Sequence, residues 1–206
     1  EQPKNGILLD EAYEMFHPSK GVSGIRYVKD LDNSNVFLLG ACTKGLQCPG
    51  IRIGWVVASK QNVETLSNFS SFGMGGVSHP SQLYAAELLE PKRVEQARHA
   101  VESHYGMQRD RYGAAFADMG LTVHTGDGGF YHWMKLPEGL NAHDLNRRLF
   151  KHGAAILEGT DCDMARPHDK DPAYVSPYAN WFRFSFGPLL PETFESDVAL
   201  LERVLD

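Results

Sequence analysis

Apolar and polar residues follow two different patterns along this chain of 206 residues. Up to about residue 90, short apolar runs separated by glycine-rich loops predict buried strands and then helices. From residue 92 to about 119, apolar side chains recur with a helical period and predict one long helix. After residue 120, runs rich in aromatic and β-branched residues predict further strands between helices. The predicted strands cover residues 7–9, 36–39, 53–57, 121–123, 130–136 and 181–186. The predicted helices cover residues 62–69, 79–89, 92–119, 143–152 and 191–205.

This change of pattern predicts two domains. Residues 1–108 are expected to form an α/β domain with a mostly parallel sheet, because its strands are short continuous apolar runs. Residues 109–206 are expected to form a smaller α+β domain, in which Asn141 is the expected N-cap of the helix at 143–152. We expect the boundary to lie inside the long linking helix at about 92–119.

Composition limits the classes of function that the chain can have. A net charge of −6, with no basic stripe among aromatic residues, argues against a nucleic-acid partner. No apolar stretch is long enough to span a bilayer, so no membrane partner is expected. Residues 1–6 resemble neither a signal peptide nor an initiator sequence. We therefore expect the chain to come from the middle of a longer sequence.

Cysteine and histidine usage predicts neither a disulfide framework nor a metal site. Cys42, Cys48 and Cys162 are too few for such a framework and are expected to be reduced, buried thiols of a cytoplasmic protein. No histidine pair has the HExxH spacing, and His99 and His104 lie five residues apart, on different faces of a helix. We expect no bound metal.

Lys44 and Arg52 point to a cofactor. Lys44 follows the predicted strand at 36–39, and ligands of open α/β sheets gather at the carboxyl ends of strands. A partly desolvated lysine there can form a Schiff base with a carbonyl cofactor. Arg52 lies eight residues later among glycines and suits a fixed phosphate. Together the two residues suggest pyridoxal phosphate, although a lysine taken alone is more commonly a solvated surface residue.

Three further residues could complete such a site. Asp10, at the end of the predicted strand 7–9, could keep the pyridine nitrogen of the cofactor protonated, so that the ring draws electrons. Asp10 could instead cap a following helix. Tyr13 could direct its hydroxyl to the phenolic oxygen of the cofactor, and Thr43 could add a hydroxyl to the phosphate site.

Arg183 is the candidate for binding a substrate carboxylate. It lies in a predicted strand between two phenylalanines, and a buried arginine rarely lacks a partner. The guanidinium matches a carboxylate ligand, but an ion pair with Asp or Glu would explain the residue equally well. The aromatic residues Tyr131, Trp133 and Trp181 are expected to fill the core of the second domain rather than to select a bulky substrate.

Four segments occur in an order that is informative as a set. They are Asp10-Glu11-Ala12-Tyr13, Lys44 with Pro49-Gly50-Ile51-Arg52-Ile53-Gly54, Gly128-Gly129-Phe130-Tyr131, and Phe182-Arg183-Phe184-Ser185. In order and approximate spacing they resemble the successive signatures of the class I/II aminotransferases. That family belongs to the aspartate-aminotransferase-like, fold-type I pyridoxal-phosphate enzymes, and the resemblance spans residue 7 to the C-terminus.

The resemblance implies the C-terminal half of the large pyridoxal-phosphate-binding domain, followed by the small domain. It implies a ping-pong exchange of an amino group between an α-amino acid and a 2-oxo acid. Lys44 would be the Schiff-base lysine and would move a proton at the substrate α-carbon. Asp10 would pair with the pyridine nitrogen, and Tyr13 would contact the phenolic oxygen. Arg52 would bind the phosphate and Arg183 the substrate carboxylate. Family members are typically homodimers with sites at the subunit interface.

The chain departs from the family pattern in three places. Ala41 stands where many members have a hydroxyl residue that binds the phosphate, which leaves Thr43 as the candidate replacement. Glu158-Gly159 stands where many members have proline-glycine. The N-terminal half of a complete member has no counterpart before Asp10. We therefore expect a fragment with exposed apolar sheet edges, which binds pyridoxal phosphate poorly and is inactive alone. The other half would be supplied in cis or by a second polypeptide.

Two alternatives to an aminotransferase remain open. The same scaffold supports other pyridoxal-phosphate reactions, such as those of a β-lyase or a synthase. The chain could also be a non-catalytic half that serves as a binding or regulatory module. An enzyme is favoured over such a module because the chain retains all five side chains of the expected site, Asp10, Tyr13, Lys44, Arg52 and Arg183.

Overall fold

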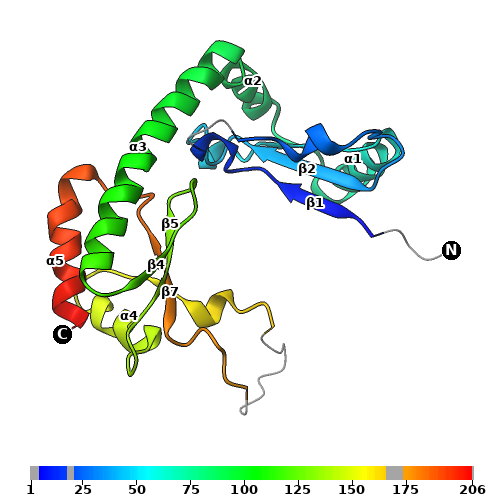
Figure 1. The fold of residues 1–206 in the computed structure, drawn as a ribbon. Helices are drawn as coiled ribbons and strands as arrows, with labels where there is room; N and C mark the ends of the chain where they lie inside the picture. Colours follow the sequence, from blue (N-terminus) through cyan, green and yellow to red (C-terminus); the bar gives the residue numbers. More distant parts are fainter. Residues whose placement is uncertain (1–4, 18–20, 166–173, 206) are drawn as a thin grey trace. The chain divides into compact units, whose positions relative to one another are not determined.

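The chain forms two compact units, Glu1–Ser103 and His104–Asp206. The computed structural model describes residues 5–17, 21–165 and 174–205. Helix α3 (Pro91–Asp118) carries the chain from the first unit into the second (Figure 1).

A three-stranded sheet in the order β1-β2-β3 forms the base of the first unit. Its strands are β1 (Ile7–Asp10), β2 (Val36–Ala41) and β3 (Gly54–Val57). β1 and β2 are parallel, with Leu9 opposite Leu38, and they lie side by side in Figure 1. β2 and β3 are antiparallel, with Ala41 opposite Gly54.

The prediction of a mostly parallel sheet is therefore wrong, because the sheet of the first unit is small and mixed. The physical reason lies in the link between β2 and β3. A parallel connection needs a crossover that is usually built around an α-helix. Residues 42–53 contain only a 3-10 helix, η3 (Pro49–Ile51), so the chain returns antiparallel to β2.

The outer strand β1 is exposed, although the sequence predicts a buried strand there. Its Ile7 is 56% exposed and its Leu8 is 62% exposed. In the described chain β1 has a neighbour on one side only, so its apolar side chains have little to pack against. The expectation of exposed apolar edges is confirmed.

Two helices of the first unit confirm the sequence prediction. They are α1 (Lys60–Met74) and α2 (His79–Leu88). Ser59 and Ser78 are their N-caps, and each hydroxyl accepts a hydrogen bond from a backbone N–H in the first turn. Gly75, with φ of 69°, ends α1 in the left-handed conformation that glycine adopts at low cost.

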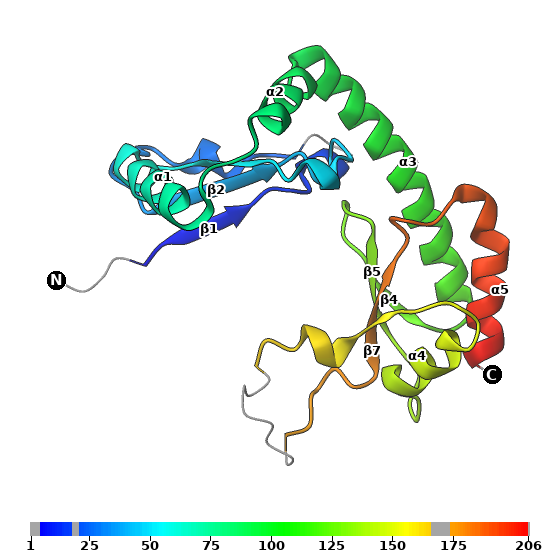
Figure 2. The ribbon, with the colours of Figure 1, turned by 180° about the vertical axis from the view of Figure 1, so that it is seen from behind.

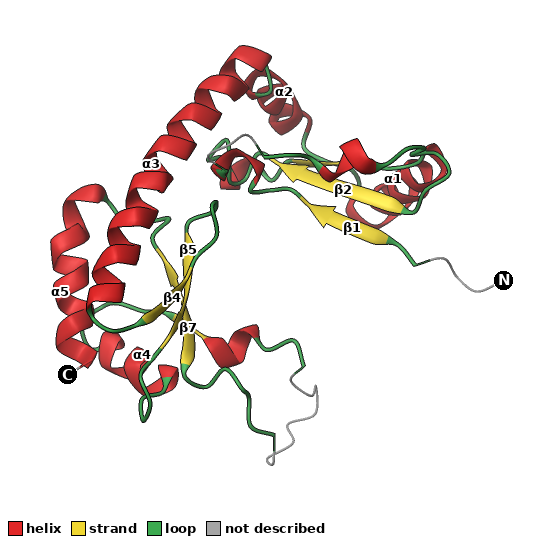
Figure 3. Ribbon diagram, in the orientation of Figure 1, coloured by secondary structure: helices red, strands yellow, loops and turns green. Residues whose placement is uncertain are grey.

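The second unit contains a four-stranded antiparallel sheet in the order β4-β5-β7-β6. The strands are β4 (Thr122–His124), β5 (Tyr131–Lys135), β6 (Leu157–Glu158) and β7 (Trp181–Ser185). Helix α5 (Phe194–Leu205) runs beside the second half of α3 (Figure 2). In Figure 3 both helices lie next to the strands. Across the described residues, no helix has the length and apolar content needed to cross a lipid bilayer.

Helix α4 (Ala142–Phe150) follows β5 and begins at the predicted cap. The side-chain oxygen of Asn141 accepts a hydrogen bond from the backbone N–H of Asp144 at 2.8 Å. This bond satisfies one of the donors that every helix start leaves unpaired, so the local sequence fixes where α4 begins.

One face of this sheet forms the core of the second unit. His132, Met134, Phe182 and Phe186 are fully or almost fully buried there. The opposite face carries Tyr131, Trp133 and Trp181, which are only half-buried. The expectation that these three aromatic residues fill the core is therefore wrong. Because side chains alternate across a strand, residues of β5 that flank the buried His132 must point away from the core.

Candidate functional site

The sheet of the first unit brings one end of each of its three strands to the same end of the sheet, which we call the site edge. β1 ends at Asp10 and its parallel neighbour β2 ends at Ala41. β3 begins at Gly54, opposite Ala41, because it runs antiparallel to β2. The segments that carry the candidates Asp10, Lys44 and Arg52 therefore all meet the sheet at the same edge.

Lys44 lies close to Tyr13 at this edge. Lys44 is half-buried in the turn that follows β2, and its Nζ lies 5.9 Å from the centroid of the Tyr13 ring. That distance is at the limit of a cation–π contact. The Tyr13 ring also packs against Phe16, with ring centroids 5.5 Å apart. The structure thus brings together two of the predicted cofactor residues.

The backbone of the Lys44 loop is held in a defined conformation. The N–H of Gln47 donates to the carbonyl of Lys44 at 3.0 Å, and that of Cys48 donates to the carbonyl of Cys42 at 3.1 Å. Gln47 and Arg52 have φ values of 52° and 53°, in the left-handed region that costs a non-glycine residue roughly 1–2 kcal/mol. The surrounding contacts must offset this strain. Such strain often accompanies functional sites.

Gly45 allows a close approach beside Lys44. A Cβ at this position would lie 2.5 Å from the sulfur of Met15, which is buried in the helix η1 (Glu14–Phe16). The absence of a side chain therefore lets the Lys44 loop pack directly against the segment that carries Tyr13.

Arg52 and Thr43, the two candidates for binding the phosphate, form few hydrogen bonds with other groups. Arg52 is exposed, and its Nη1 donates to the carbonyl of Pro49 at 2.9 Å. Within the described part of the chain, Arg52 forms no ion pair and the half-buried Thr43 hydroxyl forms no hydrogen bond. Ala41, the departure from the family pattern, ends β2 without a hydroxyl.

Asp10 is exposed at the end of β1. Its Oδ1 accepts a hydrogen bond from the backbone N–H of Ala12 at 3.1 Å. Asp10 and Ala12 also line an open concavity of about 430 Å³ over strands β2 and β3. Asp10 thus stabilises a local turn, and it leaves carboxylate capacity for another donor.

Two titratable groups near this edge have shifted pKa values. Burial raises the pKa of Glu14, an effect that the positive charge of Arg98 partly offsets. Burial also raises the pKa of the Cys42 thiol, and the neighbouring Cys48 adds to the rise.

Cys42 is buried whereas Cys48 and Cys162 are half-buried, so the prediction of three buried thiols is wrong for two. In the described residues, no three His, Cys, Asp or Glu side chains are grouped as a metal site would require.

Arg183 belongs to β7 of the second unit. Its guanidinium carbon lies 4.3 Å from the centroid of the Tyr131 ring, and Trp133 is its direct partner across the strand pair. Among the described residues, Arg183 pairs with no carboxylate. Of the two explanations for this arginine, the ion pair with Asp or Glu is therefore absent from the described chain. Sequence patterns do not pair Tyr131 with Arg183, because the pairing of β5 with β7 is set by the fold, and only the alternation of side chains along each strand offers a signal.

Glu158-Gly159, which stands where many family members have proline-glycine, has a clear structural role. The Glu158 carboxylate lies 3.2 Å from Nδ1 of His143 and accepts a hydrogen bond from Nδ2 of Asn146 at 3.1 Å. A Cβ at Gly159 would lie 2.5 Å from the carbonyl oxygen of Tyr178. Glycine is therefore required at position 159. Glu158 connects β6 to α4 through its contacts with His143 and Asn146.

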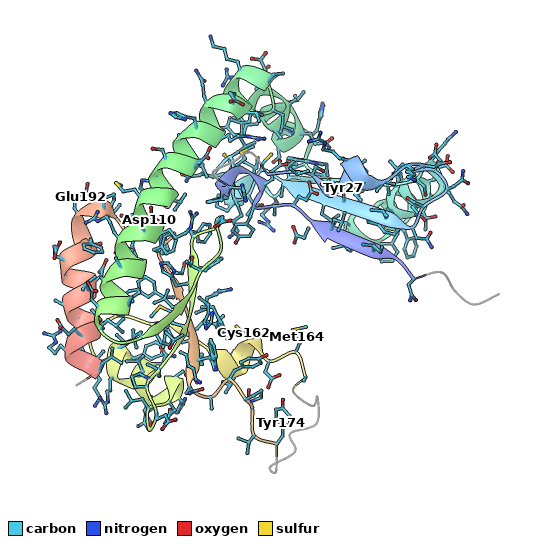
Figure 4. The ribbon with its side chains drawn as sticks, in the orientation of Figure 1. Tyr27, Asp110, Cys162, Met164, Tyr174 and Glu192 are labelled. Carbon is cyan, nitrogen blue, oxygen red and sulfur yellow. The ribbon has the colours of Figure 1, made fainter. Side chains whose placement is uncertain are left out.

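The segment after Gly159 is tied to the residues that precede β7. Asp163 accepts hydrogen bonds from the hydroxyls of Tyr174 at 2.7 Å and Ser176 at 2.6 Å. Figure 4 labels Cys162, Met164 and Tyr174 in this region, and Met164 is 97% exposed. These bonds position the approach to β7, the strand of Arg183.

Comparison with known proteins gives one family match and several relatives. Residues 3–193 match the model of the family described as aminotransferase class I and II. Over 136 residues the chain is 27% identical to the L-aspartate:5-guanidino-3-methyl-2-oxopentanoate transaminase of Pseudomonas syringae pv. syringae, covering 53% of this chain and 35% of that protein. Over 204 residues it is 26% identical to the HTH-type transcriptional regulator TauR of Rhodobacter capsulatus, covering 97% of this chain and 40% of TauR.

Solved structures share the fold of all or nearly all of the chain. LysN, the α-aminoadipate aminotransferase of Thermus thermophilus, was solved in complex with N-(5'-phosphopyridoxyl)-L-leucine. It is similar with a TM-score of 0.80 and 22% identity, covering 97% of this chain and 50% of LysN. MJ0684 of Methanococcus jannaschii gives a TM-score of 0.81 at 18% identity, covering 100% of this chain and 51% of that protein. The chain thus spans about half the length of these structures, and less than half of the two curated relatives.

Proposed function

The chain belongs to the class I and II aminotransferases, a pyridoxal-phosphate-dependent family, and on this premise we propose that it is the C-terminal portion of an aminotransferase. The complete protein would exchange an amino group between an α-amino acid and a 2-oxo acid. The observation that carries the proposal is the shared edge at which the segments carrying Asp10, Lys44 and Arg52 reach the sheet, with Lys44 beside Tyr13.

The residues at this edge fit pyridoxal phosphate. Such a cofactor requires an amine, a carboxylate with spare acceptor capacity and an arginine that is available for the phosphate. Lys44, Asp10 and Arg52 provide these groups, and Arg52 has no carboxylate partner in the described chain. When bound, pyridoxal phosphate supplies an aldehyde and an electron-withdrawing ring. The Lys44 amine would hold the aldehyde carbon and later move a proton at the substrate α-carbon.

The other residues would bind and orient. Asp10 would hold a proton on the pyridine nitrogen, because a carboxylate next to it favours the charged ring. Tyr13 would direct its hydroxyl to the phenolic oxygen. Arg52 would donate to phosphate oxygens through its remaining N–H groups, with Thr43 contributing a hydroxyl in place of the one absent at Ala41. Arg183 would bind the substrate carboxylate.

The rest of the site would come from outside this chain. The solved relatives are about twice as long, and the exposed apolar edge of β1 suits a neighbouring strand. We propose that this strand and the remaining phosphate ligands belong to an N-terminal half, present in cis or on a second polypeptide. A homodimer and a cytoplasmic location stay predictions.

A regulatory domain is the second candidate function. Its support is TauR, a transcriptional regulator to which 97% of this chain aligns. In such a protein the same residues would bind pyridoxal phosphate and an amino acid as signals, without turnover. The YdcR regulator of Escherichia coli K12 is a further relative of this kind, at 27% identity over 128 residues.

Covalent trapping tests the cofactor site. In the full-length protein that carries this chain, borohydride reduction after loading with pyridoxal phosphate is expected to label Lys44, read by peptide mass spectrometry. Lys44→Ala should abolish the label and lower amino transfer to 2-oxoglutarate at least about 10²-fold, because the variant lacks the amine that moves the proton. Lys29→Ala, at an exposed lysine, is the control that keeps both. Absence of any labelled lysine in the unmodified protein would contradict the proposal.

Product analysis separates the candidate functions. Amino transfer to 2-oxoglutarate supports an aminotransferase, whereas elimination products without amino transfer indicate a β-lyase. Labelled Lys44 with neither reaction, together with DNA binding that changes with an added amino acid, indicates a regulator.

A further inference from the structure

One face of the second unit's sheet surrounds Arg183 with aromatic rings. We call the residues Tyr131, Trp133, Trp181 and Arg183 the aromatic face. On β5 and β7 they occupy alternate positions, so their side chains share the side of the sheet opposite the core. All four are half-buried, in contrast to the fully buried His132 and Phe182 that alternate with them.

Contacts within the aromatic face fix the orientation of Arg183. The Tyr131 ring covers one side of the guanidinium at 4.3 Å. A carboxylate ligand binds in the plane of a guanidinium, through its outer N–H groups, and does not need the side that faces the Tyr131 ring. Tyr131 therefore positions Arg183 without competing for its donors.

The two tryptophans lie next to this arginine and pack against each other. Their rings stack with centroids 5.6 Å apart at an angle of 16°. Trp133 lies directly across from Arg183 and Trp181 lies two residues away on the same strand. A ligand whose carboxylate binds Arg183 therefore has Trp133 and Tyr131 as its nearest aromatic neighbours on this face.

We propose that the aromatic face selects substrates that combine a carboxylate with an aromatic side chain. The inference rests on the proposed function, because it takes Arg183 as the residue that binds the substrate carboxylate. Aromatic rings gain from offset or edge contacts in addition to the area that they bury, so a phenyl group on the ligand favours binding next to Trp133 and Tyr131. A short aliphatic side chain would leave this surface uncovered.

Binding of two unreactive carboxylates tests the proposal in the full-length protein loaded with pyridoxal phosphate. Calorimetric titration should give a Kd for 3-phenylpropanoate about tenfold below that for propanoate. Trp133→Ala and Tyr131→Leu should each remove most of this difference, while Tyr131→Phe, which keeps the ring, should retain it. Arg183→Gln should weaken both ligands. Equal affinity of the unmodified protein for the two carboxylates would overturn the proposal.

Controls separate this proposal from the proposed function. Phe150→Ala removes an aromatic ring that is 64% exposed at the end of α4 and should leave the ratio of the two Kd values unchanged. Borohydride labelling of Lys44 should persist in the Trp133 and Tyr131 variants. Labelled Lys44 with no aromatic preference contradicts the selectivity alone, whereas loss of labelling in the unmodified protein contradicts the proposed function.

Discussion

At the scale of single residues, His132 is an unusual titratable group. It is fully buried in the core of the second unit, where its ring contacts Phe116 and Phe186 at centroid distances of 6.2 and 5.1 Å. Gly113 in α3 makes room for it, because a Cβ there would lie 3.3 Å from the imidazole. Burial lowers the pKa of His132 to about 4, an effect that the backbone of Arg109 only partly offsets.

The second unit should lose stability as the pH falls from about 6.5 to about 4. In this range the unfolded chain binds a proton at His132 that the folded chain does not, so acid favours unfolding. The loss should approach roughly 3 kcal/mol and become constant below about pH 4. Denaturant unfolding followed by the fluorescence of Trp133 and Trp181 measures it.

The matched variants are His132→Leu and His152→Gln. The first should flatten the pH dependence of the unfolding free energy, because an apolar side chain of similar volume takes no proton. The second changes an exposed histidine at the end of α4 and should leave the dependence intact. An unchanged dependence in His132→Leu would assign the effect to other groups.

At the scale of elements, the return of the chain from β2 to β3 decides the geometry of the candidate site. The antiparallel pairing places the start of β3, and with it Arg52, at the edge reached by Lys44. Gly40 in β2 lies opposite Trp55 in β3, and the indole occupies the space that a side chain at Gly40 would need. This close approach fixes how the two strands pack.

Gly40→Ala should destabilise the first unit by about 1–3 kcal/mol, because the new Cβ would lie 2.3 Å from Nε1 of Trp55 and force a shift. Gly50→Ala is the control, since a Cβ there meets nothing within 4 Å. Chemical denaturation followed by Trp55 fluorescence compares the two variants. Equal stability of both would show that β2 and β3 adapt without cost.

At the scale of the whole molecule, the two units differ in how well they bury their apolar residues. The first unit exposes apolar side chains on α1 as well as on β1, and Phe69 and Phe72 are 73% and 95% exposed. The sheet of the second unit covers a core in which Tyr112, Phe116 and Phe182 are fully buried. Because apolar burial is the main source of stability, we expect the first unit to gain more than the second from a segment that covers these side chains.

The chain of 206 residues produced alone should therefore show weaker hydrogen-exchange protection in β1 and α1 than the full-length protein. The strands of the second unit should be protected equally in both. The chain alone should also bind pyridoxal phosphate at least about tenfold more weakly, since part of the phosphate site is proposed to lie elsewhere. Equal protection of β1 in the two proteins would contradict the idea that this strand gains a neighbour.

Sequence patterns predicted most elements of both units. The apolar run at 36–39 gave β2, the helical period gave α3, and Asn141 marked the start of α4. They missed β6, because its two residues are too short for any period to appear. They also assigned Trp133 to the core, since an aromatic residue in a strand does not report which face of the sheet is covered.

The sequence by itself determined where the chemistry-bearing residues lie along the chain. Lys44 after a strand and Arg52 among glycines follow from local composition and spacing alone. Only the tertiary structure decided that β3 runs antiparallel and that Arg183 lies against the Tyr131 ring without a carboxylate partner in the described chain. The reason is physical: periodicity records which side chains are apolar, whereas strand direction and burial depend on the partner that each segment meets.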